Sequence, residues 1–298
     1  MPEVSIIIPN YNHAEFLQQR LDSVFNQTYQ EFEVILLDDA STDGSVEILK
    51  KYQEHPKVSH LILNDTNSGS PFKQWQKGIG LANGAYIWIA ESDDYCELDF
   101  LDCLVSKLEQ NSDVVLVYSA SSIIDDAGKN LGRHKWADTL DKDRWNHTYA
   151  NTGRDEIKRF LRYRNTITNA SAVVFKKSAI RAIRFPTQMQ FCGDWLFWIA
   201  LLKQGDLVYI HKELNYFRRH EASTKTIKTF SKEQKRIKEY INIFLNTSNF
   251  FDRIINFNKY LWVLDEWSYK RGSFPDKNLS DLNLPLDFLV YFKLKEKK

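Results

Sequence analysis

The first 110 residues alternate four times between short apolar segments and segments with helical periodicity. The apolar segments are Val4–Ile8, Glu33–Leu37, Val58–Leu63 and Ala85–Ala90, and the helical ones are Glu15–Asn26, Ser45–Glu54 and Phe72–Ala82. Short connections between such segments favour parallel strands with helices on both faces of the sheet. The sequence therefore predicts an α/β fold with a Rossmann-like, mostly parallel central sheet.

The segment Ala85–Ala90 is continuously apolar, as in a strand that is buried on both faces. It is followed at once by Glu91, Asp93 and Asp94. Open α/β sheets bind ligands at the carboxyl ends of their strands. Clustered carboxylates beside phosphates are typical of Mg²⁺ or Mn²⁺ sites. A metal site at this strand end is one interpretation.

Helix capping is the other interpretation of these carboxylates. Asp94 and Glu97 have the spacing of a capping box for a helix from about Tyr95 to Gln110. Capping accounts for Asp94 but leaves Glu91 and Asp93 unexplained.

Polar residues also follow the other three predicted strands. They are Asn10 to Asn12 after the first strand, Asp38 and Asp39 after the second, and Asn67 after the third. Four polar strand ends at one edge of a sheet indicate a binding site rather than a set of turns. The glycine patterns of dinucleotide-binding and P-loop proteins are missing from the sequence, so a site that meets phosphates through a metal fits better.

The rest of the chain is predicted in less detail. A strand is expected over Val114–Ala120 and a long excursion or lid over Ile123–Asn151. The helix that begins at Trp195 is apolar nearly all round and should be buried. Further predicted segments are a helix over Glu156–Arg162, strands over Ala172–Phe175, Leu207–His211 and Leu214–Phe217, and a helical, aromatic and basic region from Ser231 onward.

Composition narrows the class of protein. The chain has 298 residues, 43% of them hydrophobic, which is enough for a large core in one or two domains. A net charge of +1 provides no general field for nucleic acid, so no nucleic-acid partner is expected. Three cysteines without C-x-x-C spacing favour a reducing compartment. With no signal-like start and no apolar run of 18 residues, we expect a cytoplasmic location.

Several motifs together resemble the inverting family 2 glycosyltransferases. They are Pro9-Asn10-Tyr11-Asn12, the stretch from Gln27 through Asp38-Asp39 to Gly44, Asn67-Ser68-Gly69, and Asn83-Gly84 into Glu91-Ser92-Asp93-Asp94. The resemblance covers about residues 3–220 and implies the GT-A fold. It implies a catalytic domain over 1–225, with a nucleotide-binding half up to about 110 and an acceptor half over 111–225. Residues 226–298 would form a helical extension.

The resemblance also implies a nucleotide-sugar donor whose diphosphate is held by Mn²⁺ or Mg²⁺ at an Asp-x-Asp motif. The motif is Glu91-Ser92-Asp93 here, and the glutamate leaves open whether Glu91 contacts donor or metal. Asp93 is the expected principal ligand, with Asp94 as the alternative.

For the donor base, the resemblance implies stacking near Tyr11 and a hydrogen bond to Asp39. A carboxylate that accepts from an imide N–H favours uracil or thymine. Pro9, Asn12, Asn67 and Ser92 are the other donor-binding candidates carried by the matched motifs. The segment 69–78 departs from the family pattern of an Arg-Asn pair. Lys73 either supplies the cation there or is a helix-surface lysine.

Two later motifs complete the resemblance. Gly193-Asp194-Trp195 is similar to the family's acidic motif, with Gly193 in place of glutamate. It implies that Asp194 is the general base, whereas the structural alternative is a cap for the following helix. The stretch from Tyr216 to Ser223 resembles a Tyr-Arg-x-His loop that closes over the diphosphate. It makes Arg219 a candidate for phosphate and His220 a candidate for phosphate or metal.

Two other classes remain open. A sugar-nucleotide pyrophosphorylase has a similar sheet but needs a glycine-rich basic loop after the first strand. The segment Pro9-Asn10-Tyr11-Asn12 is not such a loop. A non-catalytic sugar-nucleotide-binding protein is suggested by the glutamate at 91 and the glycine at 193. For a transferase, the expected acceptor is a glycan or lipid-linked hydroxyl in bacterial surface polysaccharide synthesis.

The C-terminal region also has two interpretations. Residues 231–298 either pack their aromatic side chains on the core or approach an anionic membrane. The lysines that would contact such a membrane are Lys293, Lys295, Lys297 and Lys298.

Overall fold

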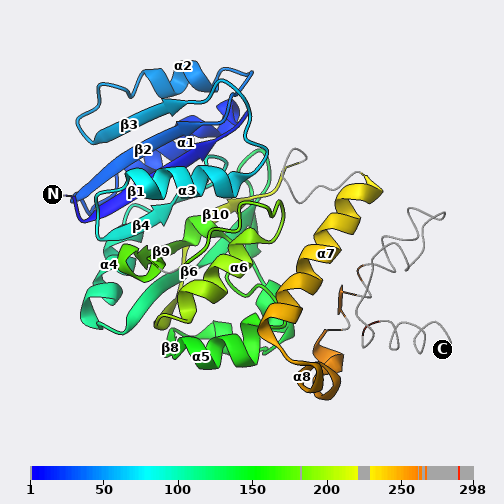
Figure 1. The fold of residues 1–298 in the computed structure, drawn as a ribbon. Helices are drawn as coiled ribbons and strands as arrows, with labels where there is room; N and C mark the ends of the chain where they lie inside the picture. The colour runs from blue at the N-terminus through cyan, green and yellow to red at the C-terminus, as the bar shows by residue number, and fades with distance from the viewer. Residues whose placement is uncertain are drawn as a thin grey trace.

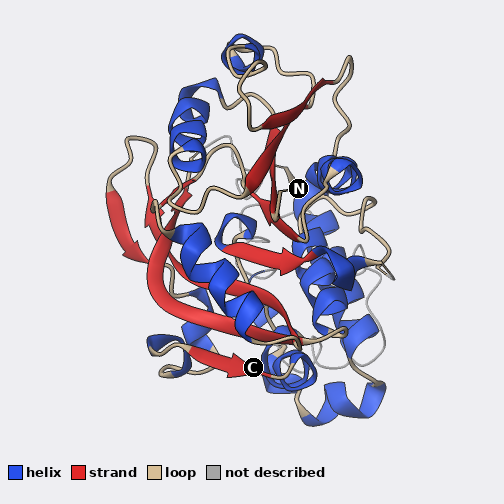
Figure 2. Cartoon of the chain, turned by 90° about the vertical axis from the view of Figure 1, so that its left-hand side faces the viewer, coloured by secondary structure: helices blue, strands red, loops and turns tan. Residues whose placement is uncertain are grey.

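The computed structural model describes residues 2–181, 183–220 and 229–260, together with Trp262, Val263, Glu266 and Phe288. Within these residues one ten-stranded sheet is flanked by helices on both faces (Figures 1 and 2). The strands are β1 (Val4–Asn10), β2 (Phe32–Asp38), β3 (Val58–Leu63), β4 (Tyr86–Ile89), β5 (Tyr95–Cys96), β6 (Val114–Ile124), β7 (Asn130–Arg133), β8 (Tyr149–Asn151), β9 (Val173–Lys176) and β10 (Asp206–Arg218). The α-helices are α1 (Ala14–Phe25), α2 (Ser45–Lys50), α3 (Pro71–Leu81), α4 (Phe100–Gln110), α5 (Gly153–Glu156), α6 (Gly193–Leu202), α7 (Phe230–Thr247) and α8 (Phe250–Ile255).

The sheet has the order β3-β2-β1-β4-β9-β6-β10-β5, with β7 on β6 and β8 on β10. Strands β3, β2, β1 and β4 are parallel to one another, and β6 is parallel to β10. Strand β9 runs antiparallel between β4 and β6. The four predicted N-terminal strands and their parallel arrangement are confirmed, so their carboxyl ends lie at one edge.

Two hydrophobic cores lie on opposite faces of this sheet. In β1, Ile6 and Ile8 belong to one core and Ile7 to the other, because successive side chains of a strand alternate. Helices α1, α2 and α4 cover the first face, and α3, α6 and α7 cover the second. Helix α6 is buried as predicted, and its residues Trp195 and Trp198 are almost completely inaccessible. The sheet is therefore held rigidly from both sides.

The predicted helix from Tyr95 with its Asp94 cap is wrong. Tyr95 and Cys96 form β5, which pairs antiparallel with β10, and α4 begins only at Phe100. The Tyr95 ring stacks on Tyr216 of β10, 4.3 Å between centroids. Pairing with a remote strand has overridden the local helical preference.

Other segments differ from the prediction in length. The two short strands expected near residues 207–217 are one continuous strand, β10, with register shifts near Glu213. Strand β6 continues to Ile124, and part of the predicted excursion returns to the sheet as β7 and β8. The helix expected over Glu156–Arg162 is the short α5 followed by a π-helical turn over Ile157–Leu161. Helix α2 ends at Lys50.

The C-terminal helix α7 packs on the core beside α6 (Figure 1). Tyr240 and Phe244 contact the Trp195 ring edge-on. Glu239 accepts hydrogen bonds from the backbone N–H groups of residues 190–192. The expected domain boundary near 225 and the four tail lysines, Lys293, Lys295, Lys297 and Lys298, lie outside the described residues. No helix in the described ranges is long and apolar enough to cross a bilayer.

Candidate active site

The loops after β1 and β2 are tied together at the carboxyl edge of the sheet. Asn10 Nδ2 donates to Asp38 Oδ2 (2.8 Å), and Asn12 Oδ1 accepts from the Thr42 backbone N–H (2.7 Å). Asn12 has a φ of 56°, a left-handed conformation that asparagine tolerates better than most residues. This turn leaves the Tyr11 ring 45% exposed, whereas Pro9 is buried within β1.

Asp39 organises the next loop along this edge. Its Oδ1 accepts from Asn64 Nδ2 and Gln74 Nε2, both at 2.7 Å, and its Oδ2 accepts from the Ser68 hydroxyl at 2.7 Å. Asn67 Nδ2 donates to the Asp39 backbone oxygen at 3.0 Å. The carboxylate of Asp39 therefore shapes the loop that should face a base, and its contact with the base stays a prediction.

Lys73 lies on the exposed face of α3, where its Nζ donates to the Ser68 backbone oxygen (2.8 Å). Lys73 and Asp39 therefore bind the same loop, at Ser68. Its role as a donor-binding cation stays a prediction.

Glu91 follows β4 and points toward α3. Trp75 Nε1–H donates to Glu91 Oε1 (2.9 Å), and the Glu91 backbone N–H donates to the Ser171 hydroxyl (3.1 Å). Burial raises the pKa of Glu91 to about 8, and the nearby Asp93 charge acts in the same direction. With no cation bound, this side chain is therefore mostly a neutral acid at neutral pH.

Asp93 forms a cluster with two histidines. The candidate ligand atoms of His13, Asp93 and His220 all lie within 4.8 Å of one another. His220 Nε2 is 3.1 Å from Asp93 Oδ2. His13 Nδ1 is 2.8 Å from the buried Ser92 hydroxyl, which leaves Nε2 of this ring for the cluster. A second partner of this kind fixes the orientation of a metal-binding imidazole.

The protonation of these groups reflects their contacts. Burial alone would raise the pKa of Asp93, but its hydrogen bond with His220 and the charges of both histidines hold that pKa below its usual value. The same hydrogen bond raises the pKa of His220. Burial lowers the pKa of His13. Asp93 is therefore the carboxylate that stays ionised in this group.

Asp94 points away from the histidines and into the protein. Its Oδ1 accepts from the Arg218 backbone N–H (2.9 Å), and its Oδ2 accepts from Asn169 Nδ2 (3.0 Å). Burial, followed by the neighbouring Asp93 charge, raises the pKa of Asp94 to about 6. Both of its oxygens are thus engaged in holding β10 and the loop before β9.

Of the two arginines at the end of β10, the structure buries Arg218. Its guanidinium binds the backbone oxygens of Asp93 (2.9 Å), Asp125 (2.9 Å) and Asp126 (3.0 Å). Arg219 is exposed beyond the strand, and its phosphate contact stays a prediction. The sequence offered no way to choose between adjacent arginines.

Asp194 lies in the first turn of α6. The helix begins at Gly193 with Cys192 as its N-cap residue, so Asp194 does not occupy the cap position. Asn165 Nδ2 donates to Asp194 Oδ2 at 2.9 Å. The side chain is partly accessible, as a proton acceptor for a substrate must be.

Gly193 has a packing explanation. A Cβ at this position would come within 2.5 Å of the Phe72 ring of α3. The absence of a side chain at Gly193 therefore leaves room for Phe72, which belongs to the segment of α3 that departs from the family pattern.

Sequence reasoning placed the carboxylates but missed several partners. It did not select His13, Trp75, Asn165, Asn169 or Arg218. The position of His13 directly after the polar turn of β1 was the one available signal.

Comparison with known proteins identifies relatives that match a large part of this chain. The family described as Glycosyl transferase family 2 matches residues 5–184. TuaG of Bacillus subtilis, a glycosyltransferase named for teichuronic acid biosynthesis, is 26% identical over 208 residues, which cover 70% of this chain and 75% of TuaG. TarS of Staphylococcus aureus, a poly(ribitol-phosphate) beta-N-acetylglucosaminyltransferase, is 36% identical over 122 residues, which cover 39% of this chain and 21% of TarS.

Solved structures agree on the architecture. The crystal structure of residues 1–349 of S. aureus TarS in complex with UDP-GlcNAc has a TM-score of 0.68 and 20% identity. The match covers 94% of this chain and 77% of that one. This likeness shows the fold, which is GT-A as expected.

Proposed function

The chain belongs to glycosyl transferase family 2, and we propose that it moves a sugar, with inversion, from a nucleoside-diphosphate sugar to an acceptor hydroxyl. The observation that carries the proposal is the His13–Asp93–His220 cluster at the carboxyl end of β4. It lies on the sheet edge that also holds the Tyr11 and Asp39 loops, where open α/β sheets bind ligands.

The residues of the cluster fit a divalent metal. Asp93 offers one carboxylate oxygen and the two histidines offer imidazole nitrogens. Imidazole suits transition metals, whereas Mg²⁺ prefers oxygen ligands. We therefore favour Mn²⁺ over Mg²⁺, with Asp93 and His220 as ligands and His13 as a third. A divalent ion bound there would stabilise charge on a leaving diphosphate.

Asp194 is the proposed general base. It removes the proton from the acceptor hydroxyl as that oxygen forms a bond to the anomeric carbon. The bond between the anomeric carbon and the diphosphate oxygen breaks on the opposite side, and its electron pair leaves with the nucleoside diphosphate. Asn165 holds Oδ2 of Asp194, so the side chain is oriented before the acceptor arrives.

The donor base would bind between Tyr11 and the loop built on Asp39. We propose UDP or dTDP as the nucleotide, with Pro9, Asn12, Asn67, Lys73, Ser92 and Arg219 as further donor-binding residues and Glu91 as the residue that fixes Trp75. TarS, a relative, has crystal structures in complex with UDP and with UDP-GlcNAc, which supports a uridine donor.

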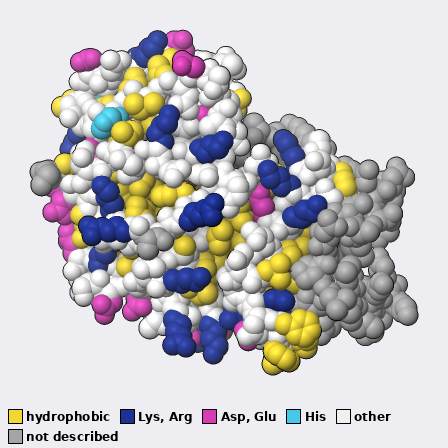
Figure 3. Space-filling view, viewed as in Figure 1, with side chains coloured by type: hydrophobic (Ala, Val, Ile, Leu, Met, Phe, Trp, Pro, Cys, Tyr) yellow, Lys and Arg dark blue, Asp and Glu magenta, His cyan; other side chains and the backbone are white. Residues whose placement is uncertain are grey.

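The acceptor is proposed to be a glycan or lipid-linked hydroxyl of a bacterial surface polymer, as the names of TuaG and TarS suggest. A cytoplasmic location at an anionic membrane fits such an acceptor. In the described residues, α8 exposes an apolar group at the lower edge of Figure 3, with Phe251 73% and Ile255 80% accessible. Lys and Arg side chains are distributed over the same face (Figure 3).

A donor-turnover assay tests the proposal. The purified protein is incubated with UDP- and dTDP-sugars in EDTA, Mg²⁺ or Mn²⁺, and the products are identified. Metal-dependent release of nucleoside diphosphate supports transfer. Formation of nucleoside triphosphate from pyrophosphate would identify a pyrophosphorylase instead, and donor binding without turnover would identify a binding protein.

A further inference from the structure

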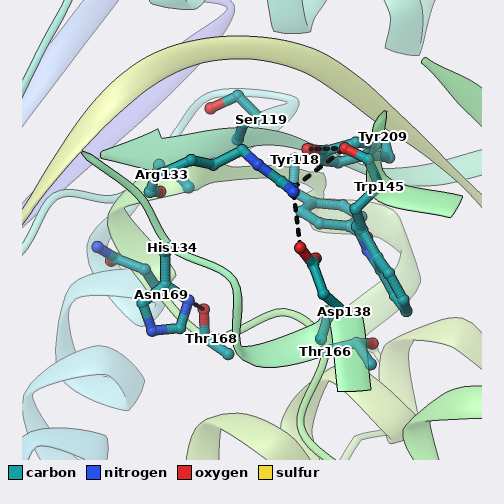
Figure 4. Close-up of a pocket in the computed structure, with 14 residues that line it drawn as sticks. Tyr118, Ser119, Arg133, His134, Asp138, Trp145, Thr166, Thr168, Asn169 and Tyr209 are labelled. Atoms are coloured by element: carbon teal, nitrogen blue, oxygen red, sulfur yellow. Dashed lines mark hydrogen bonds and ion pairs between the residues drawn. The ribbon is translucent and has the colours of Figure 1, made fainter. Parts of the chain in front are cut away.

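The polar pocket lined by Arg133, Asp138 and Trp145 is too small for a ligand larger than water (Figure 4). Its volume of about 30 Å³ admits one or two water molecules. A larger feature, for which the proposed reaction gives no role, lies on the surface at helix α8.

Helix α8 exposes its apolar side chains and buries its arginine, the reverse of an ordinary surface helix. Arg253 is 8% exposed, and its Nη1 donates to the Ser248 backbone oxygen (2.8 Å). The exposed fractions of the apolar residues are 47% for Phe250, 73% for Phe251, 39% for Ile254 and 80% for Ile255. We call these four residues the α8 patch. A contiguous apolar group on the surface marks an interaction site, because its exposure to water is unfavourable.

The contacts of α8 hold the patch in a defined position. Asn249 Oδ1 accepts from the Asp252 backbone N–H (2.8 Å) and so caps the helix. Asp252 Oδ2 lies 3.6 Å from Nη1 of Arg162, which follows the π-helical turn. Figure 1 shows α8 projecting below the end of α7. The α8 patch is therefore presented outward from the body of the protein.

Basic side chains lie near the α8 patch. In residues 155–162 and 252–259, the accessible or partly accessible charged side chains are the cations Lys158, Arg159, Arg162 and Lys259 and the carboxylates Asp155 and Asp252. Glu156 of the same segment is buried and pairs with Arg144. Figure 3 shows basic side chains along the same lower edge as the apolar group of α8. The excess of cations favours a partner with a negatively charged surface.

The size of the α8 patch favours a bilayer over a second copy of the chain. With about 200 Å² for each fully exposed side chain, the four exposed fractions amount to about 500 Å². A stable protein interface buries about 800 Å² on each partner. An interfacial helix needs a smaller apolar face, because anionic headgroups attract the neighbouring cations as well.

We propose that the α8 patch and the basic residues beside it form a surface that binds an anionic lipid bilayer. Phe251 and Ile255 enter the boundary between headgroups and acyl chains, and Lys158 and Arg159 contact the headgroups. The inference rests on the proposed function and deepens it, because this surface would hold the enzyme where a lipid-linked acceptor hydroxyl is found.

Flotation of the full chain with vesicles tests this surface. The vesicles contain phosphatidylcholine alone or phosphatidylcholine with phosphatidylglycerol, each at low and high salt. We expect binding to the anionic vesicles at low salt and weaker binding at high salt. The double variant Phe251→Ser with Ile255→Ser should bind at least about tenfold more weakly. Lys158→Gln and Arg159→Gln should each weaken binding by about fivefold.

Two matched variants outside the α8 patch serve as controls. Leu98→Ser removes an apolar side chain that is 50% exposed, and Lys50→Gln removes a cation from α2, at the opposite end of the molecule in Figure 1. Both should bind vesicles like the parent. The inference is overturned if the parent does not bind anionic vesicles at low salt, or if the α8 variants bind them like the parent. It is also overturned if the α8 variants abolish self-association of a parent that binds no vesicles.

Donor turnover in solution separates this inference from the proposed function. Turnover without vesicles should be the same for the parent and the α8 variants, because α8 lies outside the candidate active site. Turnover by a parent that binds no vesicles would refute the membrane surface alone. Vesicle binding by a parent that turns over no donor would refute the proposed function, whereas the membrane surface would be supported.

Discussion

Replacing Glu91 by glutamine should make the protein more stable at neutral and alkaline pH. The pKa of Glu91 is about 8 in the folded protein, compared with 4.5 ordinarily. At pH 7 folding must therefore protonate a carboxylate that is ionised in the unfolded chain, which costs up to about 3 kcal/mol. Glutamine carries no such cost and can still accept the hydrogen bond from Trp75 Nε1.

The sign of the effect fixes its pH dependence. The folded state binds the extra proton, so stability falls as pH rises from about 4.5 to 8 and is constant above that range. The Tm of Glu91→Gln should exceed that of the parent by an amount that increases as pH rises through this range. Because the Glu91 side chain is only partly buried, we expect about 3–6 °C at pH 8, at about 2–4 °C per kcal/mol.

Thermal unfolding monitored by circular dichroism between pH 4.5 and 9, in EDTA, measures the effect. Glu47→Gln, which removes the same charge from the exposed surface of α2, is the matched control and should shift Tm little at any pH. Parallel pH profiles for Glu91→Gln and the parent would refute the argument, because they would mean that Glu91 is ionised normally in the folded protein.

Four further outcomes are expected. Asp93→Ala should abolish the rise in Tm caused by Mn²⁺ and metal-dependent turnover while the fold survives; an unchanged Mn²⁺ response in thermal shift would remove Asp93 from the metal site. Mn²⁺ affinity of the parent, measured by calorimetry, should increase from pH 5.5 to 7.5, because the raised pKa of His220 means that a proton must leave before metal binds. Asp194→Asn should lower kcat by about 10²–10⁴-fold with little change in donor KM, and a normal kcat would exclude Asp194 as the base. Asp39→Ala should raise donor KM more than it lowers kcat, since base binding is remote from the reacting carbon, and steady-state kinetics with a normal KM would contradict that role.

The sequence alone determined the parallel part of the sheet, β1 to β4, and the edge at which the polar ends of these strands meet. The periods of β1 to β4 and of α1 and α3 are properties of neighbouring residues, so they could be recognised without any tertiary contact. Because parallel strands end at one edge, the polar residues after β1, β2 and β4 could also be assigned to one site.

Tertiary structure decided which carboxylate has which partner. Glu91, Asp93 and Asp94 are close in sequence, but they face Trp75, two histidines and the Arg218 backbone, respectively. These partners come from α3, from the residue before α1, from the segment after β10 and from β10 itself. No local sequence pattern near residue 91 indicates these partners.

The same reason explains the errors in the predicted elements. Asp94 and Glu97 have the spacing of a capping box, yet Tyr95 and Cys96 pair with β10 because Tyr216 and Asn215 lie opposite them in the fold. Periodicity reports how a segment relates to its immediate neighbours, whereas the contacts that set protonation, metal binding and specificity join segments that are distant in the chain.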